Sequence, residues 1–166
     1  MATQPCPCGN FGSPSQDCTC HPGQIQRYVG KISGPLLDRI DIHVEVPAVH
    51  YGELAAKKPG ESSASIRLRV VDAREKQAHR FAGSVGLYCN ADMSAKQIKE
   101  FCAIDSSGAD LLKTAMNKLG LSARAYDRIL KVARTIADLG GSDRIEAVHL
   151  GEAIQYRSLD RNYYSS

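Results

Sequence analysis

The sequence lacks any long apolar segment. None of its hydrophobic runs approaches the roughly 18 residues that a membrane-spanning helix needs. Its first ten residues, MATQPCPCGN, also lack the basic-then-apolar order of a signal peptide. We therefore expect a cytoplasmic protein with no membrane partner. Because thiols stay reduced in the cytoplasm, we expect the six cysteines to be free thiols or metal ligands and not disulfides.

Several motifs of nucleotide and hydrolytic sites are missing as well. The chain contains no G-x-x-x-x-G-K-[ST] phosphate loop, no G-x-G-x-x-G, no H-E-x-x-H and no G-x-S-x-G. These residues therefore do not encode a complete site for nucleotide hydrolysis or for a metalloprotease. Internal repeats and low-complexity tracts are absent too.

The composition is that of an ordinary folded protein. The chain has 166 residues, of which 43% are hydrophobic, and this is enough to bury one core. Its net charge of +3 at pH 7 permits a nucleic-acid or nucleotide partner, but an ordinary soluble surface is the simpler explanation.

Proline is confined to the first part of the chain. All seven prolines lie at or before Pro59, and none follows. Since proline interrupts helix interiors, the remainder is permissive for helices. The polar stretch AAKKPGESS, residues 55–63, has the composition of a linker. We therefore expect two parts, residues 1–60 and 61–166.

The first part contains one expected helix and one expected strand. In residues 22–32, PGQIQRYVGKI, apolar side chains recur with the spacing of a one-sided helix. In residues 40–46 apolar and polar side chains alternate, which is typical of a half-buried strand. One strand is not stable alone, and only residues 83–89 offer another short β-like run. We therefore expect its partner strands to lie outside this sequence.

The second part is expected to be a small helical bundle. Ser94 with Gln97 forms a capping box, Ser122 caps a later helix, and Gly120 ends the helix before it. The first helix is expected to turn Ile66, Val70 and Phe81 inward. The predicted helices span about residues 63–81, 94–102, 109–119, 123–139 and 143–157.

Four of the cysteines are clustered near the N-terminus. They form the pattern C-x-C-x9-C-x-C, with glycine and proline between the pairs: Cys6, Cys8, Cys18 and Cys20. Four thiolates this close in sequence could surround a tetrahedral zinc ion. The C-x-C spacing is tighter than the usual C-x2-4-C, so a loop of reduced cysteines is the alternative.

Two arginines stand in unusual positions. Arg39 directly precedes the expected strand, where it could simply pair with Asp38 or Asp41. Arg124 lies in the first turn of the helix at 123–139, where a cation opposes the helix dipole, and a nearby anion would remove that conflict. The same helix continues with basic residues that we interpret as solvent-exposed: Arg128, Lys131 and Arg134.

Two blocks of the sequence resemble one protein family. The blocks QPCPCGN…CTCHPGQIQRYVGKISGPLLDRIDIHVEVP and LGLSARAYDRILKVARTIADLGGSDRIEAVHLGEAIQYR are similar to the C-terminal part of the magnesium chelatase-like AAA+ ATPases, the ComM/YifB family. The resemblance covers nearly the whole chain. It implies a mainly α fold, in which residues 61–166 form the helical lid bundle. Residues 1–60 would be the end of an α/β AAA+ core, with one helix and the last core strand.

The resemblance implies roles for three residues. The arginine of the family's LLDR motif is an arginine finger that reaches the ATP site of the neighbouring subunit, and it matches Arg39. The sensor-2 arginine, which contacts nucleotide bound to the core of its own subunit, matches Arg124. The sensor-1 position, normally asparagine, is occupied by Gln4, which departs from the family's pattern.

The resemblance also implies a function. ATP and Mg²⁺ would serve the intact parent, whose upstream core would supply the phosphate loop and Walker B acid. Neighbouring subunits of a homo-oligomeric ring, a hexamer, would complete each site, and hydrolysis would drive DNA remodelling or branch migration. The present chain would be an excised piece without ATPase activity of its own. Two alternatives stay open: an ATPase subunit for magnesium insertion into tetrapyrroles, and a stand-alone helical module that binds nucleic acid.

Overall fold

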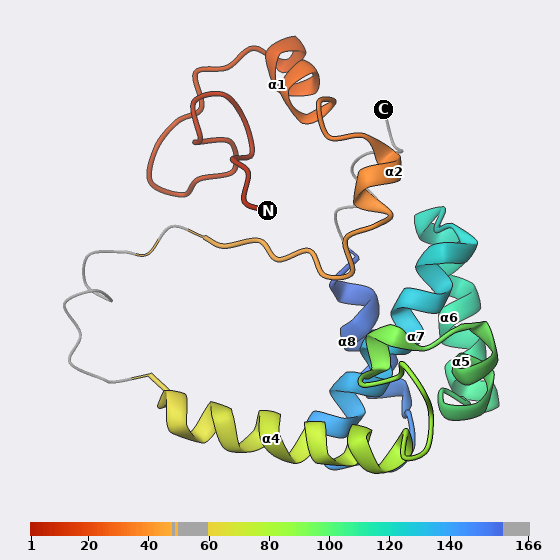
Figure 1. The fold of residues 1–166 in the computed structure, drawn as a ribbon. Coiled ribbons are helices and arrows are strands. Elements are labelled where there is room, and N and C mark those ends of the chain that lie inside the picture. The colour runs from red at the N-terminus through yellow and green to blue at the C-terminus, as the bar shows by residue number, and fades with distance from the viewer. Residues whose placement is uncertain (48, 50–59, 158–166) are drawn as a thin grey trace. The chain divides into compact units, whose positions relative to one another are not determined.

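The computed structural model describes residues 1–47, 49 and 60–157, which form two compact units (Figure 1). Within these residues, unit 1 comprises 1–40, 44–47 and 49, and unit 2 comprises 41–43 and 60–157. Helices are the only regular elements in the described residues, so the mainly α class is confirmed. None of the described helices is both long and apolar enough to cross a membrane.

Unit 1 consists of a cysteine-rich loop followed by two short helices. Helix α1 (Pro22–Val29) has proline at its first position, where the missing N–H needs no partner. The Gln24 side chain accepts the backbone N–H of His21 at 3.0 Å and so closes the start of the helix. Helix α2 (Gly34–Leu37) is a single turn. The helix predicted within residues 22–32 is therefore confirmed.

The strand predicted over residues 40–46 is not formed in this structure. No residue of the described ranges belongs to a strand. The alternating apolar residues Ile42, Val44 and Val46 are 48%, 63% and 83% exposed. A strand needs a neighbouring strand for its backbone hydrogen bonds, and the described residues contain none. The N–H of His43 instead donates to the carbonyl oxygen of Tyr156 at 2.8 Å. The sequence pattern of a strand is thus present without a sheet.

Unit 2 is a bundle whose helix ends match the predicted caps. The Ser122 side chain accepts the backbone N–H of Ala125, the capping box of Ser94 and Gln97 is present, and Gly120 adopts a φ of 62° where its helix ends. The described elements are α4 (Ser63–Arg80), the 3-10 helix η1 (Asn90–Asp92), α5 (Ala95–Phe101), α6 (Ser106–Leu119), α7 (Ala123–Leu139) and α8 (Ala147–Gln155).

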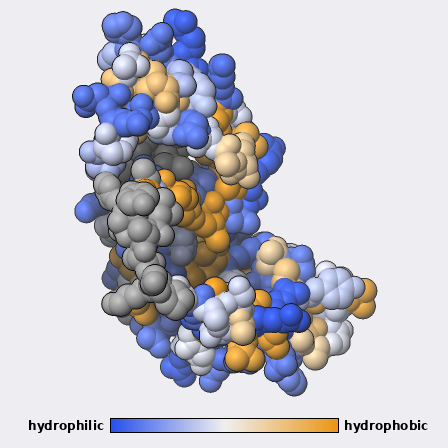
Figure 2. Space-filling model, turned by 90° about the vertical axis from the view of Figure 1, so that its left-hand side faces the viewer, coloured by the Kyte–Doolittle hydropathy of each residue, from blue (hydrophilic) through white to orange (hydrophobic). Residues whose placement is uncertain are grey.

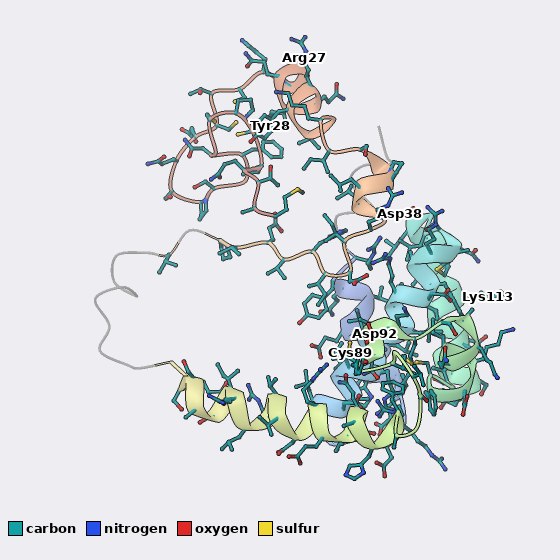
Figure 3. The ribbon with its side chains drawn as sticks, viewed as in Figure 1. Arg27, Tyr28, Asp38, Cys89, Asp92 and Lys113 are labelled. Carbon is teal, nitrogen blue, oxygen red and sulfur yellow. The ribbon has the colours of Figure 1, made fainter. Side chains whose placement is uncertain are left out.

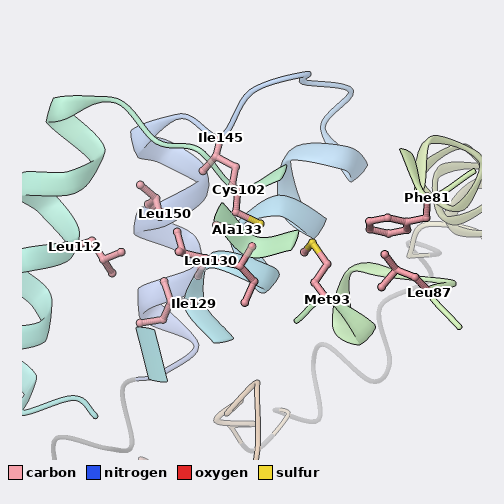
Figure 4. Close-up of a cluster of buried hydrophobic side chains, with 12 residues drawn as sticks. Phe81, Leu87, Met93, Cys102, Leu112, Ile129, Leu130, Ala133, Ile145 and Leu150 are labelled. Atoms are coloured by element: carbon pink, nitrogen blue, oxygen red, sulfur yellow. The ribbon is translucent and has the colours of Figure 1, made fainter. Parts of the chain in front are cut away.

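Helix α7 is the centre of this bundle. It packs against α8, α4, η1 and α5, while α6 packs on α8. Leu112, Ile129 and Leu150 come from three different helices and are each at most 1% exposed (Figure 4). At the edge of the core, the rings of Phe81 and Phe101 meet edge to face with centroids 5.6 Å apart. The core therefore depends mainly on the apolar stripe of α7.

Helix α4 extends beyond the bundle (Figure 1). Its second half buries Ala73 and Gln77, and α4 packs on α7. Ile66 and Val70 share that helix face by their spacing, yet they are 43% and 46% exposed. The prediction that they turn inward is therefore wrong, because the bundle ends before it reaches them. Figure 2 shows apolar side chains among charged ones on the surface at the bottom of the view, where α4 lies.

Because Leu112 is buried and Ile66 is exposed, truncating each to alanine should affect the free energy of unfolding unequally. Leu112→Ala removes a side chain that is 1% exposed and should lower the free energy of unfolding by about 2–5 kcal/mol. Ile66→Ala should change it by no more than about 0.5 kcal/mol, because this residue is 43% exposed and lies outside the core. Urea unfolding followed by helical circular dichroism measures both. Equal losses would show that Ile66 is covered in solution.

Candidate functional site

The cysteine-rich loop brings four thiols together. The sulfur of Cys6 lies 3.3 Å from that of Cys8 and 3.7 Å from that of Cys18, and the sulfurs of Cys8 and Cys18 are 3.6 Å apart. With Cys20 included, the four sulfurs lie within 4.8 Å of one another, and all four are free thiols. Tetrahedral zinc, with Zn–S bonds of about 2.3 Å, separates its sulfurs by about 3.8 Å. The cluster therefore has the dimensions of a four-thiolate metal site.

Two glycines give the loop its shape. The N–H of Gly9 donates to the carbonyl oxygen of Cys6 at 3.0 Å and closes a tight turn around Cys8. Gly9 and Gly12 have φ values of 83° and 78°, which other residues adopt only with strain. This turn folds the first cysteine pair back on itself, so both sulfurs meet despite the single residue between them.

One of these thiols ionises easily. A backbone hydrogen bond from Asn10, supported by the thiol of Cys6, lowers the pKa of Cys8 to about 6. The lowered pKa favours the thiolate of Cys8, which is the form that binds metals.

The aromatic ring of Tyr28 on helix α1 lies near a cation. The ammonium of Lys31 lies 5.9 Å from the centre of the Tyr28 ring, and Arg27 precedes the tyrosine (Figure 3). With Pro7 of the cysteine-rich loop and Gln24, these residues line a shallow cavity of about 180 Å³.

Arg39 and Gln4 both belong to unit 1 and are exposed. Arg39 follows α2, and its Nη1 donates to the carbonyl oxygen of Pro35 at 2.8 Å. The side-chain amide of Gln4 lies over Gly9, where its Oε1 would be 3.4 Å from an added Cβ. Arg124 is exposed in the first turn of α7 and belongs to unit 2. The structure therefore brings the four cysteines together and distributes the two arginines over the two units.

Sequence reasoning missed a buried polar network in unit 2. Asp138 is 2% exposed and accepts hydrogen bonds from Arg80 at 2.8 Å, from Asn90 at 2.8 Å and from Arg134 at 3.1 Å. Burial by itself would raise the pKa of Asp138, but the hydrogen bonds of Arg80 and Asn90 and the charge of Arg134 outweigh it and hold this pKa below its usual value. The network joins α4, η1 and α7.

The basic side chains of α7 form ion pairs and hydrogen bonds within unit 2. Arg134 is 2% exposed, so the interpretation of it as solvent-exposed is wrong. Its spacing of four residues from Asp138, on the helix face of Ala133 and Ala137, was the available signal. Arg128 forms an ion pair with Asp41, and Lys131 donates to the carbonyl oxygen of Ala91 at 2.8 Å. All three side chains therefore have partners inside the protein.

Comparison with known families gives two matches. The family model described as magnesium chelatase, subunit ChlI C-terminal, matches residues 60–157. The model described as magnesium chelatase, subunit ChlI, matches residues 1–54. The two matches are consecutive along the chain and together cover most of it.

Similar curated proteins come from several bacteria. The chain is 44% identical over 161 residues to competence protein ComM of Haemophilus influenzae. The aligned region covers 96% of this chain and 30% of that protein. The chain is also 43% identical over 161 residues to the uncharacterized protein YifB of Escherichia coli, with the same coverage, 96% of this chain and 30% of that protein. The chain thus spans about 30% of the length of these relatives.

Proposed function

The chain belongs to the magnesium chelatase-like family that includes ComM and YifB, and from this premise we propose that it supplies two arginines to the ATP sites of a ring-forming ATPase. Arg39 would be the arginine finger, which acts on nucleotide held by a neighbouring subunit. Arg124 would be the sensor-2 arginine. Residues 1–60 would complete the ATPase core, and residues 61–166 would form its helical lid.

The observation that carries this proposal is the placement of Arg39. It stands in the motif LLDR, directly after the single turn of α2, with an exposed guanidinium. A guanidinium is always charged and presents several N–H donors, which suits the charge that spreads over the γ-phosphate oxygens in the transition state. Its hydrogen bond to the Pro35 carbonyl oxygen would have to be exchanged for one to phosphate.

Arg124 has the environment of a phosphate contact. It lies in the first turn of α7, next to the cap Ser122, where the helix dipole is positive. An arginine there is disfavoured until an anion is present, and a phosphate would then interact with both the guanidinium and the helix N-terminus. Gln4 occupies the sensor-1 position, where its amide could orient a water or a phosphate oxygen.

The proposal includes cofactors and partners. ATP and Mg²⁺ would be held by a core that carries the phosphate loop, because this sequence has none. A structural zinc ion would be held by four thiolates: Cys6, Cys8, Cys18 and Cys20. The working unit would be a homo-oligomeric ring, a hexamer, and its substrate would be DNA that is remodelled or branch-migrated. A role in magnesium insertion into tetrapyrroles is the second candidate, supported by the family's description.

A stand-alone nucleic-acid-binding module is less well supported. Such a module needs basic side chains that are available to phosphates. On α7, Arg128, Lys131 and Arg134 instead pair with Asp41, the Ala91 carbonyl and Asp138. Among the basic residues of α7, this leaves Arg124 for phosphates, so the helix does not offer the basic face that such a module requires.

The purified chain is expected to show no ATP hydrolysis above buffer, because it lacks a phosphate loop. Phosphate release is the measurement. A full-length chimera, in which this chain replaces the matching region of the Haemophilus influenzae relative, is expected to hydrolyse ATP. Turnover by the chain alone, or an inactive but folded chimera, would contradict the proposal.

A further inference from the structure

Unit 1 has almost no hydrophobic core. Among its described residues only Cys6 and Leu37 are buried, and α1 has no buried residue. The apolar residues on one face of α1 are only half-buried, namely Ile25, Tyr28 and Val29, and so is Ile32 just after the helix. Chains of about 40 residues do not usually fold on so little buried surface without a disulfide, a metal or a partner. Because the six cysteines are all free, a disulfide does not supply this stability.

The cysteine cluster occupies the place where a core would be. Cys6 is the most buried residue of the unit, at 0% exposure, and its sulfur is within 3.7 Å of two others. The cluster ends at Cys20, and the next residue, His21, is the N-cap of α1. A metal at the four sulfurs would therefore tie both ends of the loop together and fix the start of the helix.

We propose that a zinc ion bound by the four thiolates replaces the hydrophobic core of unit 1, so that the loop at residues 6–20 and helix α1 are folded only when the metal is bound. This inference rests on the zinc site of the proposed function and adds its consequence for folding. Metal binding and folding are one process when the ligands are brought together only in the folded state.

The same dependence extends toward Arg39. Backbone hydrogen bonds continue after α1, from Gly30 to Gln26, from Ile32 to Val29, from Leu37 to Ser33 and from Arg39 to Leu36. These hydrogen bonds form two groups, within residues 26–32 and within residues 33–39. The zinc ion would therefore order the first group directly and would reach the segment of Arg39 only through the chain that joins the two.

Unit 2 serves as an internal control. Its core contains Ile129, Leu112 and Leu150 and does not involve the clustered cysteines. Removal of zinc should unfold α1 and leave α7 and α8 unchanged. Two elements of one chain can thus be compared in the same sample.

The experiment is hydrogen exchange on the 166-residue chain with and without metal. Elemental analysis of the purified chain should find about one zinc per chain. After removal of zinc by a chelator, amides of α1 should lose protection at least tenfold, those of α7 should not change, and added zinc should restore α1. Cys18→Ser should behave as the metal-free chain, whereas Cys89→Ser, which lies outside the cluster, should retain both zinc and protection.

The outcomes distinguish the folding role of zinc from the presence of the zinc site itself. Bound zinc whose removal leaves α1 equally protected would overturn the folding role and leave the zinc site standing. A folded chain that contains no metal would overturn both. One iron per chain in place of zinc, which four thiolates can also hold, would overturn the identity of the metal.

Discussion

Arg39→Ala in the full-length chimera is expected to lower kcat for ATP hydrolysis by about 10³–10⁵-fold, the range seen when an arginine finger is removed. The cause is the loss of a guanidinium that stabilises charge on the transferring phosphoryl group. The KM for ATP should change much less, because the finger contributes mainly in the transition state. Arg39→Lys should restore only part of the activity, since an ammonium keeps the charge without the planar set of donors.

A matched control comes from the same unit. Arg27 is also exposed in unit 1, but it lies on α1 and belongs to neither LLDR nor the sensor positions. Arg27→Ala should leave kcat within a few-fold of the parent chimera. If Arg27→Ala and Arg39→Ala lowered kcat equally, the loss would reflect the basic charge of the unit and not a specific finger.

Asp138→Ala is expected to have the largest effect on stability, lowering the free energy of unfolding of unit 2 by about 3–5 kcal/mol. The carboxylate is 2% exposed and accepts hydrogen bonds from Arg80 and Arg134, so its removal leaves buried cations without compensation. Asp110→Ala, at an exposed position of α6, should change stability by no more than about 0.5 kcal/mol. Urea unfolding at pH 7 measures both, and similar losses would contradict the role of the network.

The same variant has an expected pH dependence. The pKa of Asp138 is held below its usual value by Arg80 and Asn90 despite burial. Its contribution is therefore complete above the unfolded pKa, about 3.9, and is lost as the pH falls through the lower folded value. The stability difference between the natural chain and Asp138→Ala should shrink as the pH is lowered from 5 toward about 2.5. A difference that stayed constant over this range would show that the ionised carboxylate is not the source.

The sequence predicted those features that depend on local chemistry. The helices follow from apolar periodicity and their ends from caps such as Ser122 and the stop at Gly120. The clustering of the cysteines follows in the same way, because Gly9 and Gly12 allow the loop to turn back between the two cysteine pairs. Such features involve residues that are close in sequence.

The features that were not predicted from the sequence depend on other parts of the fold. Ile66 and Val70 continue the inward face of α4, but periodicity does not show how far the neighbouring helices extend. The strand pattern at residues 40–46 describes a preference that needs a sheet to be realised. The partners of Arg134 are close in sequence, namely Asp138 and the carbonyl oxygens of Ser142 and Asp143. Asp138 is also bound by Arg80 and Asn90, which are more than forty residues away and lie on elements that pack against α7. Long-range pairing of this kind leaves only a weak local signal.

The most direct test of the account is a subunit-mixing experiment on the chimera. One set of subunits carries Arg39→Ala, and the other carries an inactivated phosphate loop in its core. If Arg39 acts on the site of a neighbouring subunit, each set alone is inactive, while mixed rings contain some interfaces with an intact phosphate loop and an intact arginine. We predict that mixing recovers a measurable fraction of the ATPase activity. Mixed rings that form but remain inactive at every ratio would contradict the trans-acting role of Arg39.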